Sequence, residues 1–412
     1  MRSFIATALR SGIRSAVFTL FVAGLILVSG VAVAQEAKPF KIGVLAPLTG
    51  PQTQLGQNLV AGVRFFFQQR PAIAGRSVQL VVEDTVSQPG QGLSKARKLL
   101  DLDRVDIVMG IVNSAVLDAV QGMILGRRVP LIVTNAGSDG FTKGSVNRYA
   151  FRVSHTNSQN NLALGWYAYE KLGYRRAAVL TYDFIAGVEH AGGFKKTFTE
   201  MGGTITQEVK APLGTSDFGP YISQIRTGEI DVLYVFLAGA DAIRFMQQAD
   251  SFGLKNRTKI IGPGFVADDL ILAAQRDAAV GVVTAIQYVN TIDTPENREF
   301  TAAYRKATGQ EANLYAEDAY TACEAVAKAL EEVRGDTSDI SRFVNALESV
   351  KFTSPRGPFR FDKNHQAVFT VYVARVTKIG TQYRNTIIDQ IPDVGQDWSP
   401  ASRPQPSRPQ GR

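Results

Sequence analysis

Short β-rich runs alternate with segments of helical spacing along almost the whole chain, and this alternation restricts the fold more than any other feature. A strand pattern at 40–45 precedes a loop rich in Pro, Gly and Thr at 46–56, and a helical pattern begins at Asn58. Such alternation is typical of βαβ units, which build a parallel sheet with helices on both faces. The series continues with segments at 78–82, 91–100, 105–108, 115–125 and 131–133.

The pattern then starts again, which predicts a second α/β unit of similar build. Its helical and strand segments alternate at 162–172, 177–180, 192–201, 204–209, 218–226, 232–236, 242–252 and 259–261. Each series exceeds about 100 residues, which is enough for a core of its own. Helical segments at 296–308, 315–332 and 338–349 and a β-rich stretch at 357–376 complete the body.

The first 34 residues have the pattern of an export signal. Three arginines accompany an apolar run at 16–28, and Ala32-Val33-Ala34 supplies the small residues that a signal peptidase reads before Gln35. The apolar run is shorter than the about 20 residues that span a bilayer. No cysteine lies near the cleavage site, so we expect a periplasmic protein without a lipid anchor.

The charge of the chain gives little support to nucleic-acid binding. Three of the positive charges behind the formal +8 belong to the signal, and the tail at 399–412 adds arginines and no acid. The folded body is therefore near neutral. The Pro-rich, polar composition of the tail predicts disorder. The single cysteine, Cys323, has no partner for an internal disulfide, and we expect it to be buried.

Signatures of metal, nucleotide and dinucleotide sites are missing from the sequence. No GxGxxG follows the first strand, and there is no GxxxxGK[ST] loop. The histidines lie far apart and in no metal-ligand spacing: His155, His190 and His365.

Two further segments resemble catalytic motifs only in part. Residues 136–140 read AGSDG, which departs from the GxSxG nucleophile elbow because Ala136 holds the place of the first glycine. Asp268 and Asp269 are either a pair of carboxylates or a helix cap, and the cap is the commoner arrangement. We therefore expect no enzyme activity, no metal and no cofactor.

Small polar residues follow the strands of the first unit. Asn113 and Ser114 come after the third strand, and the segment 134–138, with Asn135, Ala136 and Gly137, comes after the fourth. In open parallel sheets, ligands bind at the carboxyl ends of the strands, where helix N-termini present free N–H groups. Each set also suits an ordinary cap or turn. Their convergence on one edge favours a ligand site.

Four stretches resemble the leucine/isoleucine/valine-binding branch of the periplasmic solute-binding proteins: PLTGPQTQLGQNLVAGV, MGIVNS, VPLIVTNAG and GPFRFDKNHQAVFTVYV. The resemblance covers residues 41–376. It implies a type I periplasmic-binding fold, with two doubly wound parallel-sheet lobes joined by three crossovers. Lobe I would comprise 35–156 and 288–355, and lobe II would comprise 157–287 and 356–398.

The resemblance also implies a function and a site. Such proteins close on a small organic solute and deliver it to an inner-membrane ABC permease; we expect a monomer with no nucleic acid and no cofactor. In the family, the first lobe holds the carboxylate of the solute. The corresponding positions here are Asn113, Ser114 and Asn135 to Gly137. Leu55 falls where several relatives carry a pocket residue.

The second lobe departs from the amino-acid binders. Those relatives hold the ammonium of the ligand with an acid in a GPEG-like turn, whereas this chain reads GPGF, with Gly264 in the place of the acid. Ala186 stands where relatives often have an aromatic residue. An unpaired buried ammonium costs several kcal/mol, unless Asp183 or Asp241 replaces the acid. Apolar residues lie in candidate loops of this wall: Phe184, Phe236, Leu237 and Phe265.

We therefore predict a hydrophobic or aromatic carboxylate as the solute. Other interpretations remain open: the phenylalanines could be core residues, the solute could be a branched-chain or other amino acid, or the protein could be a ligand sensor like the amide-responsive ones. An exported α/β enzyme is the least supported.

Overall fold

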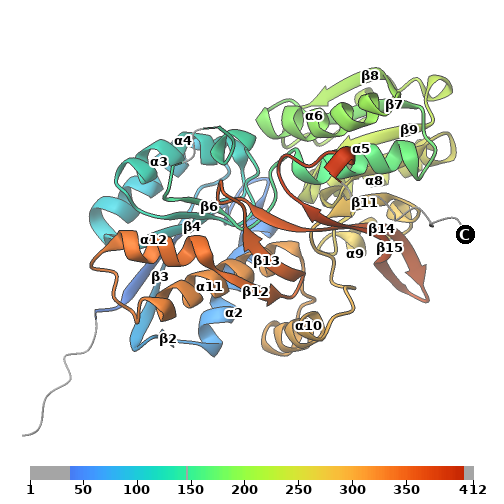
Figure 1. Cartoon of the computed structure of the whole chain (residues 1–412). Coiled ribbons are helices and arrows are strands. Elements are labelled where there is room, and N and C mark those ends of the chain that lie inside the picture. The colour runs from blue at the N-terminus through green and yellow to red at the C-terminus, as the bar shows by residue number, and fades with distance from the viewer. Residues whose placement is uncertain (1–37, 145–146, 403–412) are drawn as a thin grey trace, which may run out of the picture. The chain divides into compact units, whose positions relative to one another are not determined.

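Two sheets with helices on both faces form the framework of the chain (Figure 1). The computed structural model describes residues 38–144 and 147–402, and both sheets belong to the unit that begins at Pro39. The predicted signal lies outside the described residues. So do residues 403–412 of the predicted tail, whereas Pro400–Ser402 forms a short 3-10 helix.

The first sheet has six strands in the order β2-β3-β1-β4-β5-β6. Its central strand β1 pairs in parallel with β3 and β4, and all but one of its residues are buried. The elements of this region are β1 (Phe40–Ala46), α2 (Thr53–Gln69), β2 (Ala72–Ile73), β3 (Arg76–Asp84), α3 (Pro89–Lys98), a π-helical turn (Leu99–Asp103), β4 (Ile107–Gly110), α4 (Ser114–Gly126), β5 (Leu131–Val133), a 3-10 turn (Asp139–Phe141) and β6 (Ala150–Arg152).

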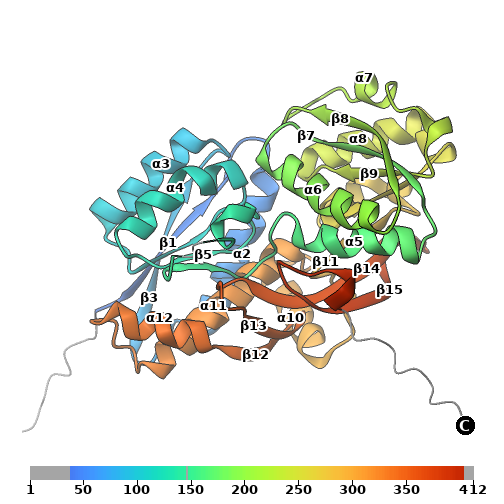
Figure 2. The ribbon, with the colours of Figure 1, turned by 45° about the horizontal axis from the view of Figure 1, so that its top comes forward.

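Helices from both ends of the chain cover this sheet. In Figures 1 and 2, α3 and α4 lie on one face, and α2 lies on the other beside α11 (Leu314–Glu332) and α12 (Ile340–Ser349). The α2 and α11 backbones approach so closely that a Cβ on Gly62 would come within 2.3 Å of the Ala316 carbonyl oxygen. A glycine is therefore required at this crossing.

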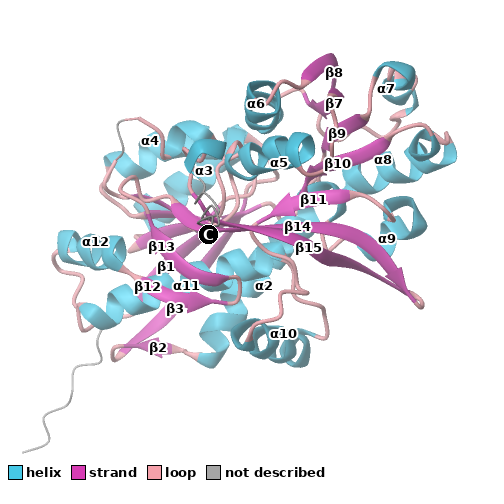
Figure 3. Cartoon of the chain, turned by 45° about the vertical axis from the view of Figure 1, so that its right-hand side comes forward, coloured by secondary structure: helices cyan, strands magenta, loops and turns pink. Residues whose placement is uncertain are grey.

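The second sheet runs β12-β13-β14-β11-β10-β9-β7-β8, with β15 also paired to β14. Its β7 to β11 core is parallel, and β14 joins it antiparallel to β11. Helices α5 and α6 cover one face and α7 to α9 the other (Figure 3). The strands are β7 (Arg176–Tyr182), β8 (Thr204–Ala211), β9 (Val232–Phe236), β10 (Lys259–Pro263), β11 (Val283–Ile286), β12 (Lys351–Ser354), β13 (Gly357–Phe361), β14 (Ala367–Ile379) and β15 (Gln382–Val394). The helices are α5 (Gln159–Glu170), α6 (Ile185–Glu200), α7 (Gly219–Ile222), α8 (Gly239–Ser251), α9 (Leu272–Gln275) and α10 (Pro295–Thr308).

The chain passes between the two regions three times, as predicted: after β6, after β11, and between α12 and β14. The predicted boundaries of the lobes remain predictions. Lys351–Ser354, assigned above to lobe I, forms β12, which pairs with β13 and through it joins the second sheet.

A buried charged cluster lies where these three passages meet. Arg356 donates to Glu317 Oε2 at 3.2 Å and to Asp318, and its Nη2 donates to the Val153 carbonyl. Gln287 donates to Asp318 Oδ2 at 3.1 Å. Burial raises the pKa of Asp318 to about 8 despite the guanidinium. Arg356, on the third passage, thus bonds directly to Val153 on the first and is linked through Asp318 to Gln287 on the second.

Most predicted segments coincide with observed elements, but some differ. Helix α2 begins at Thr53, not near Asn58, because the turn that ends at Gly50 accepts from both the N–H and the hydroxyl of Thr53. Leu55 therefore belongs to the helix and not to a loop.

The helix predicted at 218–226 shortens to α7, Gly219–Ile222. The side chains of Ser223 and Gln224 both donate to the Pro220 carbonyl, so this oxygen is satisfied without another helical turn. The long β15 was not predicted, because its partly exposed sequence lacks a regular apolar alternation.

None of the helices in the described part of the chain combines the length and apolarity that a bilayer crossing needs.

Candidate functional site

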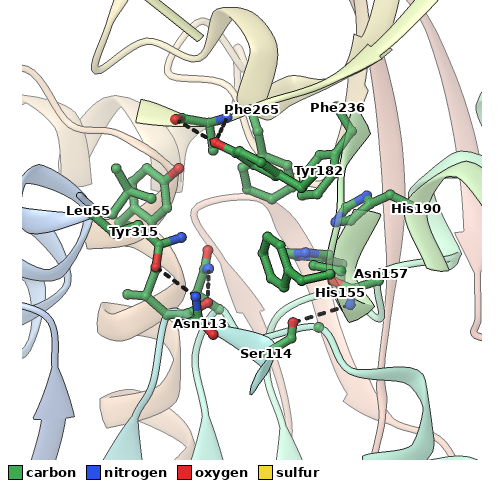
Figure 4. A pocket seen from close by; sticks show the side chains of 17 residues that line it. Leu55, Asn113, Ser114, His155, Asn157, Tyr182, His190, Phe236, Phe265 and Tyr315 are labelled. Atoms are coloured by element: carbon green, nitrogen blue, oxygen red, sulfur yellow. Dashed lines mark hydrogen bonds between the residues drawn. The ribbon is translucent and has the colours of Figure 1, made fainter. Parts of the chain in front are cut away.

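A small cavity, partly open to solvent, lies where the carboxyl ends of strands from the two sheets face each other. Figure 4 shows the 17 residues that line it. Helices α4, α6 and α8 all begin at this cavity, since Ser114, Phe184, Ala186 and Ala238 line it. Helix N-termini carry partial positive charge and free N–H groups, so three of them favour an anionic group here.

The first wall of the cavity is polar. Asn113 caps α4, since its Oδ1 accepts from the N–H groups of Ala115 at 2.9 Å and Val116 at 3.3 Å. Its Nδ2 donates to Gln52 Oε1 at 3.2 Å. The oxygen and one Nδ2 hydrogen of the Asn113 amide are thus engaged by the protein, so this side chain fixes the wall and keeps one Nδ2 hydrogen as a donor.

Ser114, the first residue of α4, presents a free hydroxyl donor on this wall. Its Oγ accepts from Asn157 Nδ2 at 3.2 Å, which leaves the hydroxyl hydrogen for a bound group. Asn157 Nδ2 also donates to Glu189 Oε2 on α6 at 2.7 Å. Ser114 is therefore tied through Asn157 to the second region.

The loop after β5 completes the polar wall. Gly137 packs so tightly on Asn157 that a Cβ there would meet Asn157 Oδ1 at 2.2 Å. Beneath the loop, the fully buried Arg152 donates to the carbonyls of Gly137 at 3.0 Å and Ser138 at 2.7 Å. Burial lowers the pKa of Arg152 to about 10, so it stays cationic at neutral pH. Its charge lies behind the wall.

The opposite wall is aromatic. His190 of α6 stacks on Phe236 with ring centroids 3.6 Å apart and an interplanar angle of 20°. Phe265 meets both rings edge-on, and Tyr182 meets Phe236 at 89°. Phe184, Leu55 and Tyr315 extend this apolar lining. Such a surface suits a flat ring, because aromatic pairs favour stacked and edge-to-face contacts.

His155 and His190 are the titratable groups of the cavity nearest to neutral pH, and both are neutral there. Burial lowers the pKa of each imidazole well below its ordinary value, and for His155 the neighbouring His190, Arg152 and Arg356 add to the effect. Tyr182 and Tyr315 are neutral phenols, because burial raises the pKa of both.

Carboxylates lie behind the cavity wall and not on it. Asp241 accepts from the Tyr182 hydroxyl at 3.2 Å and pairs with Arg244 at 3.0 Å, and Asp268 accepts from the Tyr315 hydroxyl at 3.2 Å. Asp183 is exposed and pairs with Lys210. Among the described residues, no Asp, Glu, Lys or Arg lines the cavity. Neither Asp183 nor Asp241 thus supplies the missing acid.

The structure brings most of the predicted site residues to one cavity. Those that line it are Leu55, Asn113, Ser114, Asn135, Gly137, Phe184, Ala186 and Phe236. Ala136 and Gly264 do not line it. Gly264 packs on β11, where a Cβ would meet the Ile286 Cβ at 2.6 Å, and the next residue, Phe265, reaches the cavity instead.

Sequence reasoning did not select several lining residues: Gln52, Val112, His155, Asn157, Tyr182, His190, Ala238 and Tyr315. His155 and Asn157 lie on the first passage between the regions, which has no strand or helix pattern. Tyr182 ends a buried strand and resembles a core residue. The described residues contain no group of three or more His, Cys, Asp or Glu placed to hold a metal.

Residues 39–381 match the family of periplasmic binding proteins. The chain belongs to this family. A solved ABC transporter substrate-binding protein from Sphaerobacter thermophilus is 37% identical to this periplasmic binding protein, with a TM-score of 0.82. The match covers 87% of this chain and 99% of the Sphaerobacter chain. A solute binding protein of an ABC transporter from Rhodopseudomonas palustris BisB5, solved in complex with 3,4-dihydroxy benzoic acid, is 31% identical, with a TM-score of 0.83 and the same coverage.

A curated relative, Leu/Ile/Val-binding protein homolog 6 of Brucella melitensis, is 29% identical over 365 residues, 86% of this chain and 93% of its own length. The family resemblance and the type I periplasmic-binding fold predicted from the sequence are thereby confirmed. Proteins of this family are solute-binding components of ABC transporters, which bind small organic solutes and work with a membrane permease.

Proposed function

We propose that this periplasmic binding protein captures an aromatic or similarly hydrophobic carboxylate and hands it to an inner-membrane ABC permease. The predicted export signal would place the mature protein in the periplasm without a lipid anchor. The observation that carries the proposal is the pairing of three helix N-termini with a cavity lining that holds no acidic side chain.

The polar wall provides for the carboxylate of the solute. Ser114 offers a free hydroxyl hydrogen at the first turn of α4, and the buried cation of Arg152 lies behind the Gly137 loop. Hydrogen bonds to a charged group contribute about 1.5–3 kcal/mol each. Backbone N–H groups at a helix start suit a carboxylate without a formal ion pair.

The aromatic wall provides for the rest of the solute. Phe236, Phe265 and Phe184 present apolar surface, and ring contacts of this kind add about 0.5–1.5 kcal/mol beyond burial of area. The Rhodopseudomonas palustris relative was solved with a benzoic acid of this shape, which supports the proposal.

Leucine and its relatives fit this cavity poorly. Their ammonium group would find no carboxylate on the cavity wall, since Asp241 and Asp268 lie behind it and accept from the hydroxyls of Tyr182 and Tyr315. A buried ammonium without a carboxylate partner costs several kcal/mol. We therefore expect branched-chain amino acids to bind at least ~100-fold more weakly than aromatic acids.

Titration calorimetry tests the proposal directly. The mature protein, unfolded and refolded to remove any solute that it carries, is titrated with benzoate, 4-hydroxybenzoate, cinnamate, leucine, isoleucine and valine. Saturable binding of the aromatic acids with little or none of the amino acids supports the proposal. Tight leucine binding without any aromatic acid would reverse it and favour the amino-acid role suggested by the name of the Brucella relative.

A further inference from the structure

His190 is held in one position by contacts on two sides. Its ring stacks on Phe236 at 3.6 Å, and its Nδ1 lies 2.7 Å from Asn161 Nδ2. Figure 4 shows the imidazole directed into the cavity from the side of α6. A ring fixed in this way can present only one nitrogen to a solute.

The hydrogen bonds of Asn161 decide which nitrogen of His190 carries the proton. Asn161 Nδ2 donates to the carbonyl of Asn157 at 2.7 Å, and its Oδ1 accepts from the Tyr234 hydroxyl at 2.8 Å. A carbonyl can only accept, so the amide orientation is fixed. The second Nδ2 hydrogen then points at His190 Nδ1, which must accept it.

It follows that the neutral imidazole carries its hydrogen on Nε2. No hydrogen bond from His190 Nε2 occurs within the described residues, although His190 lines the cavity. The burial that keeps this ring neutral leaves it with one donor and no charge.

The surroundings of His190 select the group that this donor can serve. Phe236 and Phe265 flank the ring. A carboxylate in this apolar corner would lose most of its hydration for one neutral hydrogen bond, and this is unfavourable. A hydroxyl on an aromatic ring can accept from this one neutral donor, and the ring itself gains the stacking surface.

We propose that His190 is a specificity-determining residue whose Nε2–H donates to a ring hydroxyl of the solute, so that the protein prefers hydroxylated aromatic acids to unsubstituted ones. Asn161 acts as a positioning residue, because it fixes the tautomer. This inference rests on the proposed function, since it assumes that the carboxylate lies on the polar wall.

The first test uses the wild-type protein and three acids. Calorimetry compares 4-hydroxybenzoate with benzoate and with 4-methylbenzoate, which matches the hydroxyl in size but cannot accept a hydrogen bond. We expect 4-hydroxybenzoate to bind at least ~10-fold more tightly than either, as one hydrogen bond allows. Equal affinities would overturn the role of His190 while leaving the proposed function intact. Failure of all three acids to bind would overturn both.

The second test keeps an aromatic ring at position 190 and removes its N–H donor. His190→Phe keeps an aromatic face against Phe236, and we expect it to weaken 4-hydroxybenzoate ~10–100-fold more than it weakens benzoate. An equal loss for both acids would show that His190 binds the carboxylate or only supports the fold, and would contradict the proposal.

A spectroscopic readout on the wild-type protein remains decisive if the variant does not fold. Nitrogen-15 imidazole spectra at neutral pH should show His190 with its hydrogen on Nε2, and this signal should shift on addition of 4-hydroxybenzoate much more than of benzoate. An Nδ1–H tautomer, or equal shifts with both acids, would refute the assignment. In Asn161→Leu the fixed tautomer and the preference for the hydroxylated acid should both be lost.

Discussion

The two walls of the cavity hold a solute by different means. Asn113 on the polar wall and Arg152 behind it form most of their hydrogen bonds within the protein, and few groups such as the Ser114 hydroxyl remain free. On the aromatic wall, contact area replaces hydrogen bonds, and His190 contributes the exception. The polar wall is therefore suited to one kind of charged group, whereas the aromatic wall sets the shape of what is attached to it.

The two walls should also differ in how strongly they discriminate between solutes. A helix start with fixed N–H groups binds most carboxylates alike, so it carries little information about the rest of the solute. The Phe236, Phe265 and His190 cluster distinguishes ring size and substituents. Comparison of variants on the two walls should separate loss of affinity from loss of selectivity.

The largest effect is expected from Phe236→Ala on the aromatic wall. This side chain is buried against His190, Tyr182 and Phe265, so its removal should lower the free energy of unfolding by about 3–5 kcal/mol. Binding of aromatic acids should weaken by ~100-fold or more, because a stacking surface is lost. Urea unfolding and calorimetry measure the two quantities.

Phe252→Ala is the control for this variant, since Phe252 is 56% exposed, and it should stay within about 0.5 kcal/mol of wild type. Unchanged affinity in Phe236→Ala would mean that the solute does not lie against this wall.

On the polar wall, Ser114→Ala should weaken binding by about 1–3 kcal/mol, through loss of one hydrogen bond to a charged group. All aromatic acids should lose the same factor, because they share the carboxylate. Calorimetry over the panel of acids measures this, with Ser251→Ala on the exposed side of α8 as the control. Wild-type binding by Ser114→Ala would place the carboxylate elsewhere.

Two substitutions at Asn113 test separately whether this side chain supports the polar wall and whether the solute approaches it. Asn113→Ala removes the cap of α4 and should lower the free energy of unfolding by about 0.5–2 kcal/mol. Asn113→Asp keeps an oxygen that accepts from the same N–H groups, so stability should be largely retained. Its negative charge should nevertheless repel a carboxylate and weaken binding. If the aspartate variant binds as wild type, the solute does not approach α4 as an anion.

The smallest expected effect is on the pH dependence of the free energy of unfolding, through Asp268 behind the aromatic wall. Burial, with Asp269 nearby, raises the pKa of Asp268 to about 7. The folded state thus holds a proton that the unfolded chain releases near pH 4, so this group stabilises the fold at low pH and the stabilisation falls as pH rises from about 4 to about 7.

Asp268→Asn should remove this slope. Its free energy of unfolding relative to wild type should therefore rise between pH 4 and pH 7 and level off above, as urea unfolding at a series of pH values can measure. Asp277→Asn is the control, because Lys378 lowers the pKa of the exposed Asp277, so its difference from wild type should be flat between pH 4 and pH 7 and change, with the opposite sign, only below about pH 4. A flat difference for Asp268→Asn would mean that this carboxyl titrates normally.

Local patterns in the sequence predicted the alternating α/β architecture and one wall of the cavity, whereas the type I periplasmic-binding fold followed from the family resemblance. Asn113, Ser114, Asn135 and Gly137 are polar residues placed directly after buried strands, and parallel strands bring such positions to one edge. The contact of these residues with a solute remains a prediction.

On the other wall the sequence also selected Phe184, Ala186 and Phe236, but further lining residues depend on tertiary contacts that no local pattern encodes. His190 lies in the second turn of an ordinary helix, and its role follows from Asn161 and Phe236, which are distant in sequence. Tyr315 reaches the cavity from a helix near the other end of the chain. The sequence placed Gly264 in the site, whereas the next residue, Phe265, lines the cavity. The packing of Gly264 against Ile286 that turns Phe265 to the cavity is not visible in the sequence.

The lack of charged side chains on the cavity wall has a consequence for capture in solutions of different ionic strength. A solute held by helix N-termini, hydroxyls and rings is attracted mainly at short range. Affinity should therefore change little between about 10 mM and about 1 M salt, although the screening length falls from about 30 Å to about 3 Å. Uptake through such a protein would be governed by how often solutes meet it, and hardly by the composition of the medium.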